Sequence, residues 1–237
     1  MAFSDIRTRV YNNINRTDIP NTSGGLIDQW INDAQRRICR SHNFTFMESE
    51  VDTTLVVGQR GYALPTASGD DLRFKTEISL EIIDSDSDRI TLKRIYKQDA
   101  ENRSEFVDNA GDGTPRNYAI QKGQIYLYPI PDTALTMNLE YYGFLDDLSA
   151  DTDTNDLEAN YPEVLEAFAT SFGFRYVFEE ERANYWESKG IDLISEMVRE
   201  SNDMKYGNIE EGMFPEDGSC TSPITNNNTI LEQEYGI

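Results

Sequence analysis

Two short runs of aspartates have the alternating spacing with which a calcium-binding loop begins. The runs are Asp84, Asp86 and Asp88, and Asp151, Asp153 and Asp156. An EF-hand loop also needs glycine at its sixth position and glutamate at its twelfth. In the first run these positions hold Arg89 and Ile95. In the second run they hold Asp156 and Pro162. We therefore expect no metal site and interpret the first run as a solvated hairpin turn, while an adventitious ion at either run stays open.

The rest of the sequence offers no complete catalytic or cofactor-binding motif. His42 is the single histidine, and no nucleophile pattern lies near it. The sequence contains no Gly-x-Ser-x-Gly elbow, no phosphate-binding Gly-Lys loop and no Cys-x-x-Cys pair. We predict that the protein is not an enzyme, and that it has no catalytic residue and no cofactor.

The composition is strongly acidic. The chain of 237 residues has a formal net charge of -22 and is 38% hydrophobic, which suffices for one or two domains with a core. An acidic surface repels nucleic acid, which argues against a DNA-binding factor. The acidity either keeps the protein soluble or provides a channel wall along which DNA slides without sticking.

Targeting and redox signals are absent from the sequence. No apolar run approaches the roughly 20 residues that a membrane span needs, and the first residues do not resemble a signal peptide. We expect no membrane partner. Cys39 and Cys220 are far apart, which favours reduced thiols in the cytosol over a disulfide framework.

The charge is unevenly distributed along the chain. Residues 1–46 carry six basic and four acidic side chains, whereas residues 179–237 carry four basic and fourteen acidic ones. This asymmetry would suit head-to-tail association of identical subunits, although a solvated acidic tail is the simpler explanation.

Residues 1–47 have the apolar spacing of two helices. The first helix, with Ser4 as its predicted N-cap, has an apolar face of Ile6, Val10 and Ile14. The second has an apolar face of Ile27, Trp30, Ile31, Ala34 and Ile38. Its polar side faces water or a neighbouring subunit, and the predicted interface residues are Gln29, Asp33, Arg36, Arg37 and Arg40.

Residues 48–159 change to the period of two that strands have. Apolar side chains alternate with polar ones around residues 78–82, 125–128 and 135–141. Gly, Pro and Asp turns separate these stretches, and Lys122-Gly123 is one of them. The pattern predicts an inserted antiparallel β-sandwich or small barrel.

Helical spacing returns in residues 160–201, where Pro162 suits a first helical turn. Two helices are predicted, and the first has an apolar stripe of Leu165, Phe168, Ala169, Phe172 and Tyr176. The predicted fold class is therefore α+β: a four-helix bundle, made of two N-terminal and two C-terminal helices, with the β-rich insertion between the two pairs.

Residues 202–237 are predicted to form an extended C-terminal arm that docks on a partner. Gly, Pro and Asn interrupt any regular element there, and the apolar content is too low for independent folding. The apolar side chains that cluster near the terminus are the predicted anchors: Ile230, Leu231, Tyr235 and Ile237.

Three stretches together resemble the head–tail adaptor (connector, or head-completion) family of tailed phages. The first is residues 26–38, with Trp30-Ile31-Asn32-Asp33-Ala34-Gln35-Arg36 at its centre. The second begins with Tyr62-Ala63-Leu64-Pro65. The third extends from Gly113-Thr114-Pro115 through residues 125–132 to residues 148–155. The resemblance covers about residues 20–175.

This resemblance implies a dodecameric ring bound beneath the portal protein after DNA packaging. In such adaptors the helical bundle builds the ring and lines or flanks the channel, while the β insertion projects outward. The arm would reach the portal, and the next tail component, a nozzle or tail tube, would dock below. The protein would assemble in the host cytoplasm, lie at the head–tail interface of the virion, and let DNA pass during genome ejection without specific binding.

Other functions remain open from the sequence alone. One is another structural subunit of the tail, such as a tube, terminator or nozzle protein. Another is an acidic metal-binding module, or a metal-dependent enzyme, that uses the aspartate runs. A DNA-binding accessory factor is the third, and the net charge disfavours it.

Overall fold

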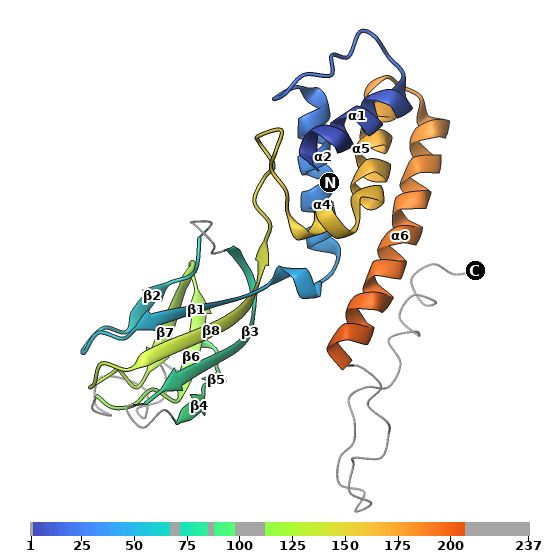
Figure 1. Ribbon diagram of the computed structural model, residues 1–237. Coiled ribbons are helices and arrows are strands. Elements are labelled where there is room, and N and C mark those ends of the chain that lie inside the picture. The colour runs from blue at the N-terminus through green and yellow to red at the C-terminus, as the bar shows by residue number, and fades with distance from the viewer. Residues whose placement is uncertain (1, 67–71, 85–87, 98–111, 207–237) are drawn as a thin grey trace, which may run out of the picture. The chain divides into compact units, whose positions relative to one another are not determined.

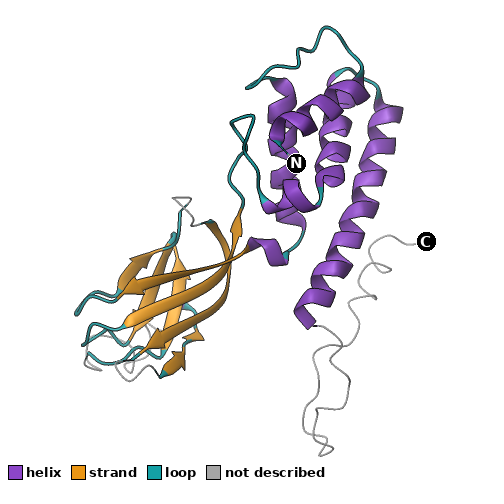
Figure 2. Ribbon diagram, viewed as in Figure 1, coloured by secondary structure: helices purple, strands orange, loops and turns teal. Residues whose placement is uncertain are grey.

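The computed structural model describes residues 2–66, 72–84, 88–97 and 112–206. In this part of the chain the fold is mixed α and β, with five α-helices and two four-stranded sheets (Figure 2). The helices are α1 (Phe3–Ile14), α2 (Leu26–Ser41), α4 (Asp156–Asn160), α5 (Pro162–Tyr176) and α6 (Glu180–Tyr206), and a short 3-10 helix, η1 (Thr45–Met47), follows α2 (Figure 1). The predicted α+β class is confirmed.

Helices α1, α2 and α5 pack around one hydrophobic core. Every residue of the predicted apolar faces of α1 and α2 is buried. Close packing of α5 depends on Gly173, because a Cβ atom there would lie 2.2 Å from Ile14 Cδ1 and 3.1 Å from Trp30 Cζ3. The packing of α6 against α5 likewise depends on a glycine, because a Cβ atom on Gly190 would lie 2.9 Å from the ring of Phe168.

Two local predictions for the helices are wrong. Helix α1 begins at Phe3 with Ala2 as its N-cap, so Ser4 is not the cap, and the Ala2 N–H donates to Asp5 Oδ2 at 3.1 Å. Tyr176 does not join the buried stripe of α5 and is 55% exposed, because the helix ends at this residue. Pro162 does begin α5, as predicted.

The strands are β1 (Glu48–Thr54), β2 (Gly61–Ala63), β3 (Arg73–Ile83), β4 (Arg89–Thr91), β5 (Lys93–Arg94), β6 (Asn117–Gln121), β7 (Gln124–Tyr128) and β8 (Thr136–Phe144). One sheet has the order β1-β8-β3-β4 and is antiparallel. The other has the order β2-β7-β6-β5, and its β5–β6 pair is parallel. Side chains of both sheets share one core, which includes Leu80, Leu127 and Leu139.

The closed barrel, one of the two predicted arrangements, is wrong for the described strands. The chain passes from one sheet directly to the other at Leu92, between β4 and β5. The Leu92 N–H donates to Leu80 O at 2.8 Å on the first sheet, and the Lys93 N–H donates to Arg116 O at 3.0 Å on the second. This crossing links two separate sheets at a corner and also produces the parallel pair, which the alternating pattern did not predict.

Two predicted hairpin turns are confirmed. Lys122 and Gly123 both have positive φ, 53° and 73°, and join β6 to β7 as a two-residue turn. Asp84 and Asp88 close the β3–β4 hairpin, because the Asp88 N–H donates to Asp84 Oδ1 at 3.0 Å. Asp86 lies outside the described residues.

A buried ion pair joins α1 to α2. The Arg7 guanidinium donates to both carboxylate oxygens of Asp28, at 3.0 Å from Nη2 to Oδ2, and both side chains are about 5% exposed. The Gly24 N–H donates to Asp28 Oδ2 at 2.6 Å, and Arg7 Nη1 lies 2.7 Å from Asp151 Oδ1. Burial alone would lower the pKa of Arg7, but hydrogen bonds to Asp28 and Asp151 raise it. The Arg7 guanidinium therefore stays charged inside the helical core.

We predict that Arg7→Met lowers the free energy of unfolding by about 3–5 kcal/mol, because it leaves the Asp28 carboxylate buried without its cation. Urea denaturation followed by circular dichroism measures this change. Adding Asp28→Leu should restore most of the loss. Arg16→Met, which removes the exposed Arg16–Asp18 pair, should change little. A denaturation midpoint of Arg7→Met equal to that of the wild type would contradict the prediction.

Candidate functional site: the polar side of helix α2

Four of the five predicted interface residues lie along one side of α2. Gln29, Asp33 and Arg40 are exposed, and Arg36, between them, is half-buried. Their spacing of three to four residues places them on successive turns of the helix. We call these four residues the α2 stripe. Arg36 bonds to Asp33 at 2.8 Å and to Asp147, so this arginine is engaged with carboxylates of its own chain.

Arg37, the fifth predicted interface residue, points toward α5 and α6. Its Nη2 donates to Glu187 Oε1 at 2.5 Å, and its guanidinium lies 4.7 Å from the centre of the Phe168 ring. Arg175 also binds Glu187. Burial would raise the pKa of Glu187, but the bonds from Arg37 and Arg175 hold it below its usual range. Arg37 thus fixes α2 to α6 within one chain.

Two polar residues of α2 that sequence reasoning did not select hold the segment that follows β8. We call residues 145–155 the linker. Asn32 Nδ2 donates to Leu148 O at 2.9 Å, and the Leu148 N–H donates back to Asn32 Oδ1 at 2.9 Å. Gln35, which is fully buried, donates from Nε2 to Asp146 O at 2.7 Å. The Asn-Asp-Ala-Gln part of the motif therefore anchors the returning chain.

The position of Gln35 in the sequence indicates that its side chain is buried and hydrogen-bonded. It lies four residues after Ile31 and one after Ala34, both fully buried, so it belongs to the buried side of the helix. A glutamine at such a position needs a hydrogen-bond partner, because an unpaired buried amide is costly. Asn155 supplies a second partner, since its Nδ2 donates to Gln35 Oε1 at 2.7 Å.

The second aspartate run shapes the linker. Asp153 Oδ2 accepts from the Ser149 N–H at 2.8 Å and from the Ala150 N–H at 2.7 Å, and these bonds lower the pKa of Asp153. Asp151 binds Arg7, which lowers the pKa of this carboxyl too. Asp156 lies in the first turn of α4. Asp153 thus closes a turn and Asp151 forms an ion pair, while the N-cap of α4 is Asn155.

Among the residues that the structure describes, no three His, Cys, Asp or Glu side chains are grouped so as to hold a metal ion. The helices in this same part of the chain are also too short or too polar to cross a membrane. The predicted anchors of the C-terminal arm lie outside the described residues: Ile230, Leu231, Tyr235 and Ile237.

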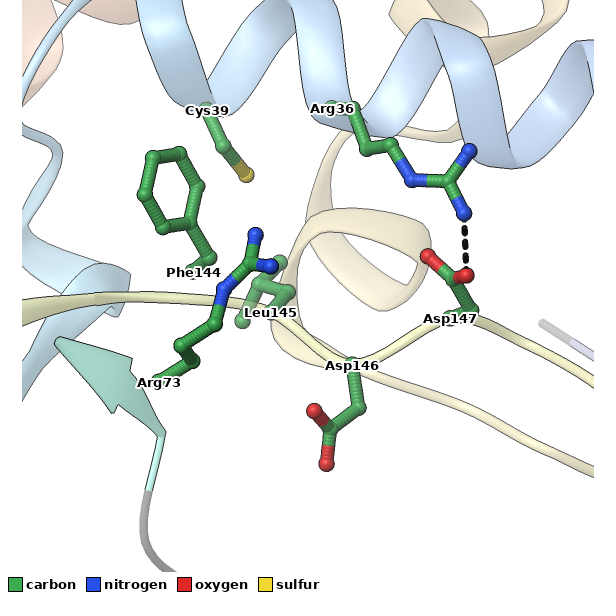
Figure 3. Close-up of a pocket in the computed structure, with 7 residues that line it drawn as sticks. All are labelled: Arg36, Cys39, Arg73, Phe144, Leu145, Asp146 and Asp147. Carbon is green, nitrogen blue, oxygen red and sulfur yellow. Dashed lines mark hydrogen bonds and ion pairs between the residues drawn. The ribbon is translucent and has the colours of Figure 1, made fainter. Parts of the chain in front are cut away.

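A pocket of about 380 Å³ lies at the C-terminal end of α2; we call it the α2-end pocket (Figure 3). Arg36 and Cys39 of α2 line one side, and Arg73, at the start of β3, lines another. The guanidinium of Arg73 lies 4.8 Å from the centre of the Phe144 ring. Leu145, Asp146 and Asp147 complete the lining.

Two arginines and two aspartates line the α2-end pocket, and Lys75 lies close to its Phe144 wall. Lys75 Nζ donates to Cys39 O at 2.6 Å and to His42 O at 2.7 Å, where the helix dipole favours a positive charge. Asp147 is paired with Arg36, and the carboxylate of Asp146 points away from α2 (Figure 3). Cys39 is 1% exposed, and burial raises its pKa to about 11, so this thiol is not a nucleophile at neutral pH.

The polar side chains of this site mostly join segments of one chain, and they leave one side of α2 and the α2-end pocket exposed. A family model described as SU10 adaptor protein matches residues 1–210, and the chain belongs to this family. No curated protein matches the chain.

The family assignment confirms the resemblance to phage head–tail adaptors. The protein is a structural adaptor of a phage virion, and it interacts with other virion components. Adaptors of this kind are generally not enzymes.

We predict that Asn32→Ala lowers the free energy of unfolding by about 1–3 kcal/mol, because the buried Leu148 backbone loses both of its partners on α2. Urea denaturation measures the loss, and amide hydrogen exchange at Leu148 should become faster. Gln29→Ala, at an exposed position of the same helix, serves as the control and should leave both unchanged. Unchanged exchange at Leu148 in Asn32→Ala would show that Asn32 does not hold the linker.

Proposed function

We propose that this protein is the head–tail adaptor that forms a ring between the portal and the tail and extends the DNA channel. The observation that carries the proposal is the family match over residues 1–210, which spans the helices and both sheets in one continuous range. The architecture as a whole is therefore that of an adaptor. If the family model matched only the helices, the match would give no information about the role of the β insertion.

The proposed ring is dodecameric and is built by the four long helices, α1, α2, α5 and α6, acting as a bundle. The α2 stripe contacts the neighbouring subunit, and the β insertion projects outward. The exposed state of Gln29, Asp33 and Arg40 supports this role, since none of them is needed to bury the core. The next tail component, a nozzle or tail tube, docks on the side opposite the portal.

The channel of the ring lets DNA pass without specific binding. The net charge of -22 supports this proposal, because every copy would bring excess carboxylates and DNA would release few counterions on passing. The pairing of two arginines of α2 also supports passage of DNA without specific binding. Arg36 and Arg37 are paired with Asp147 and Glu187, so both are already neutralised before any phosphate approaches.

Reversal of charge on the α2 stripe tests the ring. We predict that Asp33→Lys combined with Arg40→Glu abolishes most ring formation on purified portal while the melting temperature stays near that of the wild type, because both positions are exposed. Size-exclusion chromatography and electron microscopy of the mixture measure assembly. Arg16→Glu, outside the stripe, is the control. If the double variant formed rings in the same yield as the wild type, the α2 stripe would not be part of the interface.

The predicted start of the C-terminal arm at residue 202 is wrong, because α6 continues to Tyr206. The arm, now taken to follow Tyr206, is proposed to dock on the portal through Ile230, Leu231, Tyr235 and Ile237, and the truncation that leaves α6 whole ends at Tyr206. We predict that truncation after Tyr206 changes the melting temperature little and weakens portal binding by at least roughly ten-fold, since scattered anchors bind only on docking.

A full-length variant with the four anchors changed to serine is the matched comparison for the truncation, because it keeps the length of the chain. Portal affinity is measured by biolayer interferometry with immobilised portal. Equal affinity of truncated and full-length protein would assign portal attachment to the helices instead of the arm.

A further inference from the structure

The turn between α5 and α6 exposes an aromatic side chain in a backbone conformation that normally takes glycine. Phe178 is 90% exposed and has a φ of 63°. The Phe178 N–H donates to Arg175 O at 3.1 Å, and the Glu179 N–H donates to Phe174 O at 2.9 Å. These two bonds define a Schellman motif with Phe178 at its left-handed position, where glycine is strongly preferred.

Neither property of Phe178 stabilises the folded chain. A side chain in the left-handed region is strained, and an exposed phenyl ring gains nothing from burial. Two more exposed aromatic residues lie nearby in sequence, but each packs on a ring of its own chain: the ring centre of Tyr176 lies 5.6 Å from that of Trp30, and that of Tyr185 lies 5.9 Å from that of Trp186. Glu180 and Glu181 follow Phe178, both exposed at the first turn of α6. We call Phe178, Glu180 and Glu181 the knob.

We infer that the knob of one copy docks in the α2-end pocket of the next copy, with the Phe178 ring inside the pocket. The inference rests on the proposed ring and names the two surfaces that meet in it. The knob and the pocket are different surfaces of one chain, so their contact is head-to-tail, which is the type that closes rings of identical subunits.

The chemistry of the two surfaces is complementary. The pocket of about 380 Å³ has Phe144 and Leu145 in its wall, and a cavity of roughly 150 Å³ already accepts benzene. Arg36, on the opposite side, is paired with Asp147, whereas Arg73 and Lys75 contact the ring of Phe144. Around a docked Phe178 ring, Arg73 and Lys75 would face Glu180 and Glu181. In a chain with a net charge of -22, an apolar wall flanked by two cations fits an acidic aromatic knob.

Disulfide trapping tests the contact directly. Glu181→Cys, which keeps the Phe178 ring, in one copy and Asp146→Cys in the other, both in a Cys220→Ser background, are mixed and mildly oxidised. The mixture is studied free at millimolar concentration and assembled on portal, and mass spectrometry of peptides identifies the joined cysteines. The mixed pair should cross-link roughly ten-fold faster than Glu181→Cys with Thr54→Cys, an exposed control position, because docking raises the effective concentration.

A second test separates the interface from a structural role. Phe178→Gly should keep or raise the melting temperature, since glycine suits the left-handed position, while ring yield on portal falls by roughly ten-fold. Tyr96→Gly, which removes an aromatic residue that is 82% exposed elsewhere, should leave ring yield unchanged. Glu180→Arg and Arg73→Glu should each reduce cross-linking, and together they should restore it.

Each outcome decides between the proposals. Rings without preferential cross-linking, or rings formed equally well by Phe178→Gly, would overturn the knob-in-pocket contact and leave the adaptor function standing. Cross-linking without rings would support the contact and reject the ring. If Phe178→Gly lost portal binding while the cysteine pair still failed to cross-link, the knob would dock on the portal and the inference would be wrong.

Discussion

The helical core depends on the burial of a charge pair. Its two N-terminal helices and its two long C-terminal helices are separated by the whole β insertion, so the chain must return accurately to α2 after β8. The Arg7–Asp28 pair fixes α1 on α2, and the same guanidinium reaches Asp151 in the linker. The buried Asp28 carboxylate holds the guanidinium in place, because separating the two would leave an uncompensated buried charge. Asp151, which is 55% exposed, then attaches the linker to this fixed guanidinium.

Much of the fold could be predicted from apolar spacing, and the errors have physical causes. The buried faces of α1 and α2 follow from side chains that repeat every three to four residues. The crossing at Leu92 could not be predicted, because an extended segment has the same alternation whether it stays in one sheet or passes to another. The exposure of Tyr176 escaped prediction for a related reason: periodicity does not show where a helix ends.

The candidate site was predictable only in part. Polar residues on α2 were evident, but spacing alone did not separate Arg37, which binds Glu187, from Arg36 and Arg40, because all three lie close together on the helix. The roles of Asn32 and Gln35 depend on a linker more than a hundred positions away in sequence, which no local pattern records. Nothing in the sequence distinguishes Phe178 from other phenylalanines. Its positive φ, which sets it apart, is seen only in the structure.

The insertion leaves and rejoins the helical core at a single place. Strand β1 pairs with β8 along its whole length, from Glu48 opposite Tyr142 to Thr54 opposite Thr136, so the first and last strands are neighbours. Both flanking segments are attached to α2, one by continuity through η1 and the other by Asn32 and Gln35. A module with adjacent ends can lengthen, shorten or be exchanged in evolution without moving the helices that carry it. A change of length in the β insertion would therefore leave α2 in place, whereas a change in the linker would disturb its bonds to Asn32 and Gln35.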